Sequence, residues 1–67
     1  MVLRLLLITH DDILASAYRA RLMREQFAVE CRSTAHEGLA KARQWSPQII
    51  LLDVTLPGLH GLDILKS

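Results

Sequence analysis

The chain alternates short aliphatic runs with segments of helical composition. Residues 49–52 are large aliphatics that lead directly into Asp53. This run is too short for a helix and has no polar face, so it predicts a strand buried on both faces, as in a parallel sheet. Residues 2–9 form another aliphatic run and predict the first strand. Residues 27–31 alternate only loosely between apolar and polar, which predicts a strand at a sheet edge.

Two helices are predicted between these strands. Residues 13–26 contain neither glycine nor proline, and large apolar side chains recur there at every fourth position, which predicts a stripe facing the core. The stripe consists of Leu14, Tyr18 and Leu22, with Ile13, Ala17 and Ala20 alongside. The second helix begins at Thr34, because Thr34 followed three residues later by Glu37 fits a capping box. It ends before Pro47, which cannot donate a backbone hydrogen bond.

The order strand–helix–strand–helix–strand predicts an α/β fold in which right-handed crossovers join parallel strands. After a turn at Pro57 and Gly58, residues 62–66 predict the first turn of a third helix. The crossovers place the two complete helices on opposite faces of the sheet. The strand at 49–52 then keeps an unpaired edge, which is a template for self-association or for pairing with a complementing chain.

Composition narrows the class of protein. A chain of 67 residues forms at most one small domain, and its formal net charge of +1 lacks the basic excess typical of nucleic-acid binding. Cys31 is the only cysteine and cannot form an internal disulfide. No apolar run approaches the length of a membrane span. We therefore expect a soluble, cytoplasmic protein whose partners include neither membrane nor, for this segment, nucleic acid.

Acidic residues gather after the first and third predicted strands. His10, Asp11 and Asp12 follow the first strand, and Asp53 ends the third. The carboxyl ends of neighbouring parallel strands meet at one edge, so these side chains are expected to converge. Clustered carboxylates raise one another's pKa unless a cation such as Mg²⁺ shares them, and a carboxylate beside that metal can attack phosphorus. The alternative is structural, with an aspartate capping the helix and Asp53 accepting backbone N–H groups.

Three segments carry a family resemblance: the acidic end of the first strand, the helix opening at 33–37, and residues 47–61. The last segment, PQIILLDVTLPGLHG, is similar over its whole length to a phosphoacceptor strand and loop. Over residues 1–67 the chain resembles the N-terminal half of a response regulator receiver domain, a module of two-component signal transduction. The resemblance implies a flavodoxin-like three-layer α/β/α fold with strands in the order 2-1-3, truncated from the family's 2-1-3-4-5.

The same resemblance implies roles for individual residues. Asp53 would be the phosphorylated aspartate and would also bind Mg²⁺. Asp11 and the backbone carbonyl of Thr55 would be direct metal ligands and Asp12 an auxiliary one, with weak binding in this truncated form. The phosphoryl donor would be the phosphohistidine of a sensor histidine kinase, and the domain would not itself be an enzyme.

The chain departs from the family pattern at His60, where an acidic or amide residue is commoner, and in two larger respects. Receivers usually have two adjacent acids after the first strand, and here His10 falls on the first position and Asp11 on the second; a register with Asp11 and Asp12 as the pair is the alternative. The family's phosphoryl-sensing Ser or Thr and its pairing Lys come from strands beyond Ser67. Two functions stay open, a phosphoacceptor receiver and a phosphorylation-independent interaction module. A dehalogenase-type phosphatase is rejected, because its second aspartate would have to stand at Thr55.

Overall fold

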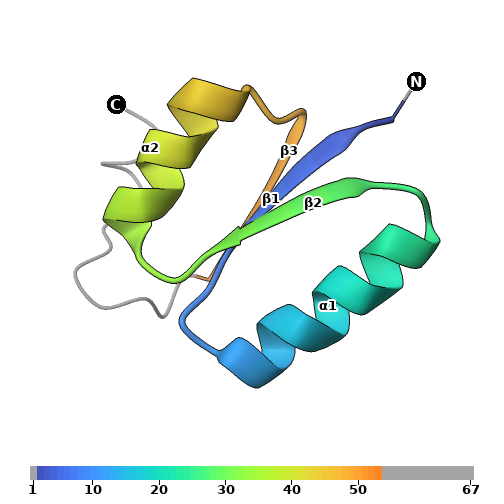
Figure 1. Cartoon of the computed structure of the whole chain (residues 1–67). Coiled ribbons are helices and arrows are strands. Elements are labelled where there is room, and N and C mark those ends of the chain that lie inside the picture. Colours follow the sequence, from blue (N-terminus) through green and yellow to red (C-terminus); the bar gives the residue numbers. More distant parts are fainter. Residues whose placement is uncertain (1, 54–67) are drawn as a thin grey trace.

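The computed structural model describes residues 2–53, which form a three-stranded sheet with two helices (Figure 1). The elements are β1 (Arg4–Ile8), α1 (Asp12–Arg24), β2 (Ala28–Arg32), α2 (Ala35–Trp45) and β3 (Ile49–Leu52). All five were predicted from the sequence in this order. The turn at Pro57 and Gly58 and the helix expected at 62–66 lie outside the described residues.

The sheet is parallel, with strands in the order β2-β1-β3. In the central strand, Leu7 pairs with Cys31 of β2 on one side and with Leu51 of β3 on the other. This order confirms the predicted fold class and places β2 at an edge. The backbone ladder also runs beyond the strand ends, because the Asp53 N–H donates to the carbonyl of Ile8 at 2.9 Å.

The two helices cover opposite faces of the sheet, so β1 is buried on both sides (Figure 1). One core cluster lies on the α1 face and contains Leu5, Leu7 and Val29, with Ala15 and Leu22 of the helix packed against it. The other lies on the α2 face and contains Leu6 and Ile8, with Ala42 and Trp45 packed against it. Alternation along β1 therefore divides its side chains between the two helices.

The structure corrects two predictions about apolar surfaces. The strand at 49–52 is not buried on both faces, since Ile50 is 48% exposed and Leu51 38% exposed. Most of the predicted stripe is exposed too, and no residue of α1 is fully buried. The exposed members are Ile13, Leu14, Ala17, Tyr18 and Ala20. The reason is that α1 packs over β2, which leaves the β3 side of the sheet open within residues 2–53.

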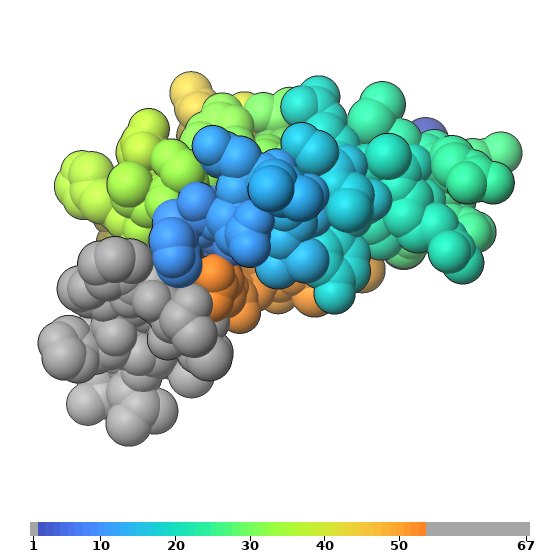
Figure 2. All heavy atoms as spheres, turned by 90° about the horizontal axis from the view of Figure 1, so that it is seen from below, coloured from blue at the N-terminus to red at the C-terminus, as the bar shows by residue number. Residues whose placement is uncertain are grey.

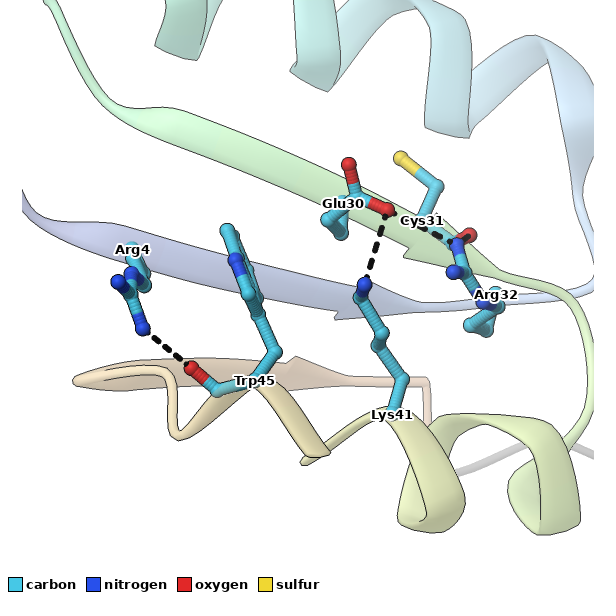
Figure 3. A network of polar contacts seen from close by, with 6 residues as sticks. All are labelled: Arg4, Glu30, Cys31, Arg32, Lys41 and Trp45. Atoms are coloured by element: carbon cyan, nitrogen blue, oxygen red, sulfur yellow. Dashed lines mark hydrogen bonds and ion pairs between the residues drawn. The ribbon is translucent and has the colours of Figure 1, made fainter. Parts of the chain in front are cut away.

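Polar and aromatic contacts fasten α2 to the strands (Figure 3). The Lys41 ammonium lies 3.6 Å from the Glu30 carboxylate of β2, and Arg32 lies 3.3 Å from the same oxygen. The Trp45 ring stands between two cations, with Arg4 5.7 Å and Lys41 5.4 Å from its centroid. Arg4 Nη1 also donates to the Trp45 carbonyl at 2.7 Å, which ties the last turn of α2 to β1.

The ends of α2 follow the sequence prediction. The Thr34 hydroxyl accepts the Glu37 N–H at 3.1 Å, as an N-cap does, and it donates to the Glu37 carboxylate at 2.9 Å. At the other end Ser46 adopts the left-handed conformation, with φ 52°, and its N–H bonds to the Ala42 carbonyl. Within residues 2–53 neither helix combines the length and the apolar character needed to cross a membrane.

Gly38 permits the close approach of α2 to β1. A Cβ atom at this position would lie 2.7 Å from Cγ1 of Ile8 and would contact its Cδ1 even more closely. Overpacking of this kind costs about 1–3 kcal/mol, which exceeds the roughly 1 kcal/mol that alanine gains over glycine in a helix. Gly38→Ala is therefore expected to lower the urea midpoint of unfolding. His36→Ala, at an exposed position of the same helix, is the control, and a midpoint unchanged in both variants would contradict the close packing.

Candidate functional site

The candidate site lies where β1 and β3 end. Ile8 pairs with Leu52, so the next residues of the two strands, Thr9 and Asp53, are neighbours at the same edge. Alternation places both on the α1 face, beyond the pair formed by Leu7 and Leu51. Figure 2 shows the end of β3, in orange, against the segment that leads from β1 into α1, in blue.

The Asp53 carboxylate has two polar neighbours on one oxygen. The Thr9 hydroxyl donates to Oδ2 at 2.9 Å, and His10 Nδ1 lies 3.4 Å from the same atom. The Asp53 side chain is 19% exposed, whereas that of His10 is 50% exposed and that of Thr9 is buried. The carboxylate is therefore largely withdrawn from solvent, and contacts from the β1 side hold it there.

An apolar groove of about 350 Å³ opens beside this carboxylate. Its lining residues come from β1, α1 and β3 and the positions that follow the strands; they are Leu7, Thr9, Leu14, Tyr18, Leu51, Leu52 and Asp53. It includes Leu14 and Tyr18 of the predicted core stripe, whereas Leu22 packs against the core. Asp53 thus marks the polar end of an open apolar surface.

Asp11 serves as the N-cap of α1. Its Oδ1 accepts the Leu14 N–H at 3.0 Å, and its own backbone N–H donates to the Thr9 hydroxyl at 3.2 Å. Asp12 is the first residue of the helix, where a negative charge interacts favourably with the helix dipole. It lines a separate groove of about 290 Å³ with Arg32 and Glu37 among its other residues. One of the two aspartates, Asp11, therefore caps α1, as the structural alternative in the sequence analysis predicted.

Cys31 adjoins that second groove but is not an activated nucleophile. Burial raises the pKa of its thiol, and Glu30 adds to the rise, while Arg19 and Arg32 oppose it. The thiol stays protonated at neutral pH, and the reactive form of cysteine is the thiolate.

Comparison with known proteins identifies the family. No family model matches the chain. It is 36% identical over 62 residues to the transcriptional regulatory protein AfsQ1 of Streptomyces coelicolor, covering 92% of this chain and 28% of that protein. It is 30% identical over 67 residues to the regulatory protein VanRB of Enterococcus faecalis, covering 100% of this chain and 30% of that protein. The signal receiver domain of a putative LuxO repressor protein from Vibrio parahaemolyticus superposes with a TM-score of 0.87 at 27% identity, over 98% of this chain and 51% of that one.

The chain belongs to the response regulator receiver family. Its homologues belong to two-component signalling, and its fold is the flavodoxin-like one that the resemblance implied. The chain spans 28% and 30% of the length of these two curated relatives and about half of the receiver structure. The relatives' regulatory activities therefore belong to much longer proteins.

The residues expected to bind Mg²⁺ are only partly described. Asp11, Asp12 and Asp53 all lie at the carboxyl end of the sheet, whereas Thr55 lies outside the described residues. Within residues 2–53, His, Cys, Asp and Glu side chains form no group of three that is arranged to hold a metal ion. The donor type still fits, because Mg²⁺ is usually held by one or two carboxylates together with water and phosphate oxygens. The metal site and its ligands stay a prediction.

Sequence analysis missed Thr9, which was assigned only to the first strand. Its hydroxyl contacts both Asp53 and the backbone of Asp11. The available signal was its position, since Thr9 follows Leu5 and Leu7 on the same face of a buried strand and is polar. Finding its partner required the register of β1 against β3, which the sequence alone did not provide.

The capping role of Asp11 gives a direct test. Asp11→Ala removes the acceptor for the Leu14 N–H and is expected to lower the free energy of unfolding by about 0.5–2 kcal/mol in urea denaturation. Asp11→Asn keeps an acceptor and should retain most of the stability. Asp12→Ala, one residue later and without a cap bond, is the matched control. Equal losses in the two alanine variants would show that the cap contributes nothing specific.

Proposed function

We propose that the chain contains the phosphoacceptor site of its receiver domain and that Asp53 receives a phosphoryl group from the phosphohistidine of a sensor histidine kinase. The observation that supports this most directly is the position of the Asp53 carboxylate, which is largely withdrawn from solvent at the carboxyl end of β3, beside the end of β1. In open parallel sheets, ligands bind in the crevice outside these strand ends. The receiver family of the chain makes phosphoryl transfer the chemistry to test there.

In the proposed step a carboxylate oxygen of Asp53 attacks phosphorus and forms an acyl phosphate. The bond from phosphorus to the imidazole nitrogen breaks, and its electron pair stays on that nitrogen of the kinase. Bound Mg²⁺ would offset the charge that builds on the phosphoryl oxygens. Asp11, Asp12, Asp53 and the backbone carbonyl of Thr55 are the proposed ligands, and Asp11 would combine this role with capping α1.

Acetyl phosphate or beryllofluoride with Mg²⁺ tests this function without the kinase. We expect shifts of the backbone amide resonances of Asp53 and of Thr9 and His10 beside it, and no such shifts in Asp53→Ala. Glu37→Ala, which removes a carboxylate from the start of α2, is the matched control and should respond as the wild type does. An amide spectrum that stays unchanged at millimolar Mg²⁺ would exclude phosphoacceptor function in this chain.

A second function is a phosphorylation-independent interaction module, and the outer side of β3 favours it. Ile50 and Leu51 project from opposite faces of this strand and are both substantially exposed. In residues 2–53, β3 pairs through one side only, since the sheet order is β2-β1-β3. An exposed aliphatic edge is a template for another strand, either from a second copy or from a complementing chain. His10, at the position of a receiver acid, fits a site that does not depend on a metal.

Sedimentation distinguishes this second function. Self-association through β3 predicts a dimer or larger assembly at high micromolar concentration, and Leu51→Lys should shift it towards monomer because the charge would be buried at the interface. Ile13→Lys is the matched control, since Ile13 is 85% exposed on α1 and does not line the groove beside Leu51. A well-folded wild-type monomer at that concentration would contradict self-association.

A further inference from the structure

A single buried hydroxyl links Asp53 to the start of α1. In the part of the chain that the structure describes, Thr9 is the only buried polar residue, with 3% of its surface exposed. Its neighbours on the same face of β1 are the core residues Leu5 and Leu7. A valine of nearly the same shape would suit this apolar position, so the presence of a hydroxyl calls for a specific partner.

The hydroxyl has two partners, and their chemistry fixes its orientation. The backbone N–H of Asp11 can only donate, so Thr9 Oγ1 accepts from it at 3.2 Å. An ionised carboxylate can only accept, so the Thr9 proton points at Asp53 Oδ2, 2.9 Å away. A hydrogen bond of this kind, to a charged acceptor in a half-buried setting, is stronger than a neutral one.

The backbone reinforces this arrangement from both sides. The Asp53 N–H is bound to the Ile8 carbonyl at 2.9 Å, and the Thr9 N–H to the Arg32 carbonyl at 3.0 Å. The main chains of Thr9 and Asp53 are therefore held in register before their side chains meet. Because the backbone is fixed at both residues, it cannot move to restore the hydrogen bond from Thr9 if the Asp53 carboxylate rotates away.

We propose that Thr9 is a positioning residue that orients the Asp53 carboxylate for phosphoryl acceptance and transmits the state of Asp53 to the N-terminus of α1. The route runs from Asp53 Oδ2 through the Thr9 hydroxyl to the backbone N–H of Asp11, whose side chain caps the helix at Leu14. The positioning role of Thr9 rests on the proposed phosphoacceptor function. The coupling of Asp53 to the start of α1 rests only on the hydrogen bonds.

Acyl phosphate formation would alter the first bond of the route. The carboxylate loses its full negative charge when one oxygen becomes esterified, so the hydrogen bond from Thr9 changes from charge-assisted to neutral. The Thr9 proton is then held less firmly, and the bond between Asp11 N–H and Oγ1 is free to adjust. The residues expected to report the change are Asp11 and Leu14, which these hydrogen bonds connect to Thr9.

The test of positioning compares Thr9→Val, which removes the hydroxyl, with Thr9→Ser, which keeps it. We expect Thr9→Val to slow phosphorylation of Asp53 by acetyl phosphate with Mg²⁺ about ten- to a hundredfold, since small misplacements of reacting groups have effects of this order. Thr9→Ser should restore most of the rate. Thr34→Val is the matched control, because Thr34 also donates to a carboxylate and accepts a backbone N–H, but at the cap of α2.

Equal rates in the wild type and in folded Thr9→Val would overturn the positioning role. Strand amide resonances of Leu6 and Leu7 establish that each variant is folded. If the wild type takes up no phosphoryl group at all, the proposed function fails, and the positioning role fails with it.

The test of coupling needs no phosphoryl group. Asp53→Ala should shift the amide resonances of Asp11 and Leu14 in the wild-type background and leave them unmoved in the Thr9→Val background. This non-additivity is the signature of a direct interaction between the two sites. The same shifts in both backgrounds would show that Thr9 transmits nothing, whatever the outcome of the phosphorylation assay.

Discussion

The parallel pairing of β1 with β3 is the constraint on which the site depends. Ile8 pairs with Leu52, and the ladder continues through the Asp53 N–H to the Ile8 carbonyl. A one-residue slip would turn the Asp53 side chain to the opposite face of the sheet, away from Thr9. The candidate chemistry is thus set first by backbone hydrogen bonds and only then by the side chains that the ladder brings together.

The strand that carries this ladder, β1, is buried on both faces. Leu5 and Leu7 pack towards α1, and Leu6 and Ile8 towards α2, so neither helix alone would enclose the strand. On the α2 side Gly38 lets the helix approach Ile8 closely. The ends of the helices also hold them in place. Asp11 caps the start of α1, and Trp45, between Arg4 and Lys41, anchors the last turn of α2.

The features predictable from sequence were those with a local cause. Short apolar runs predicted the strands, and Thr34 and Pro47 marked the ends of α2. The alternation of strands and helices along the chain predicted the parallel sheet. The burial of β3 and of Tyr18 was mispredicted, because exposure depends on which elements cover a surface and not on the pattern along one segment. The partnership of Thr9 with Asp53 was missed for a similar reason, since register joins residues that are 44 positions apart.

Two contacts reach the same oxygen of Asp53, and their settings decide which one governs its geometry. His10 is 50% exposed, and ion pairs open to solvent contribute about 0–1 kcal/mol. The Thr9 hydroxyl is buried, and a hydrogen bond to a charged group contributes about 1.5–3 kcal/mol. Of these two contacts, the hydrogen bond from Thr9 therefore contributes more to the position of the carboxylate.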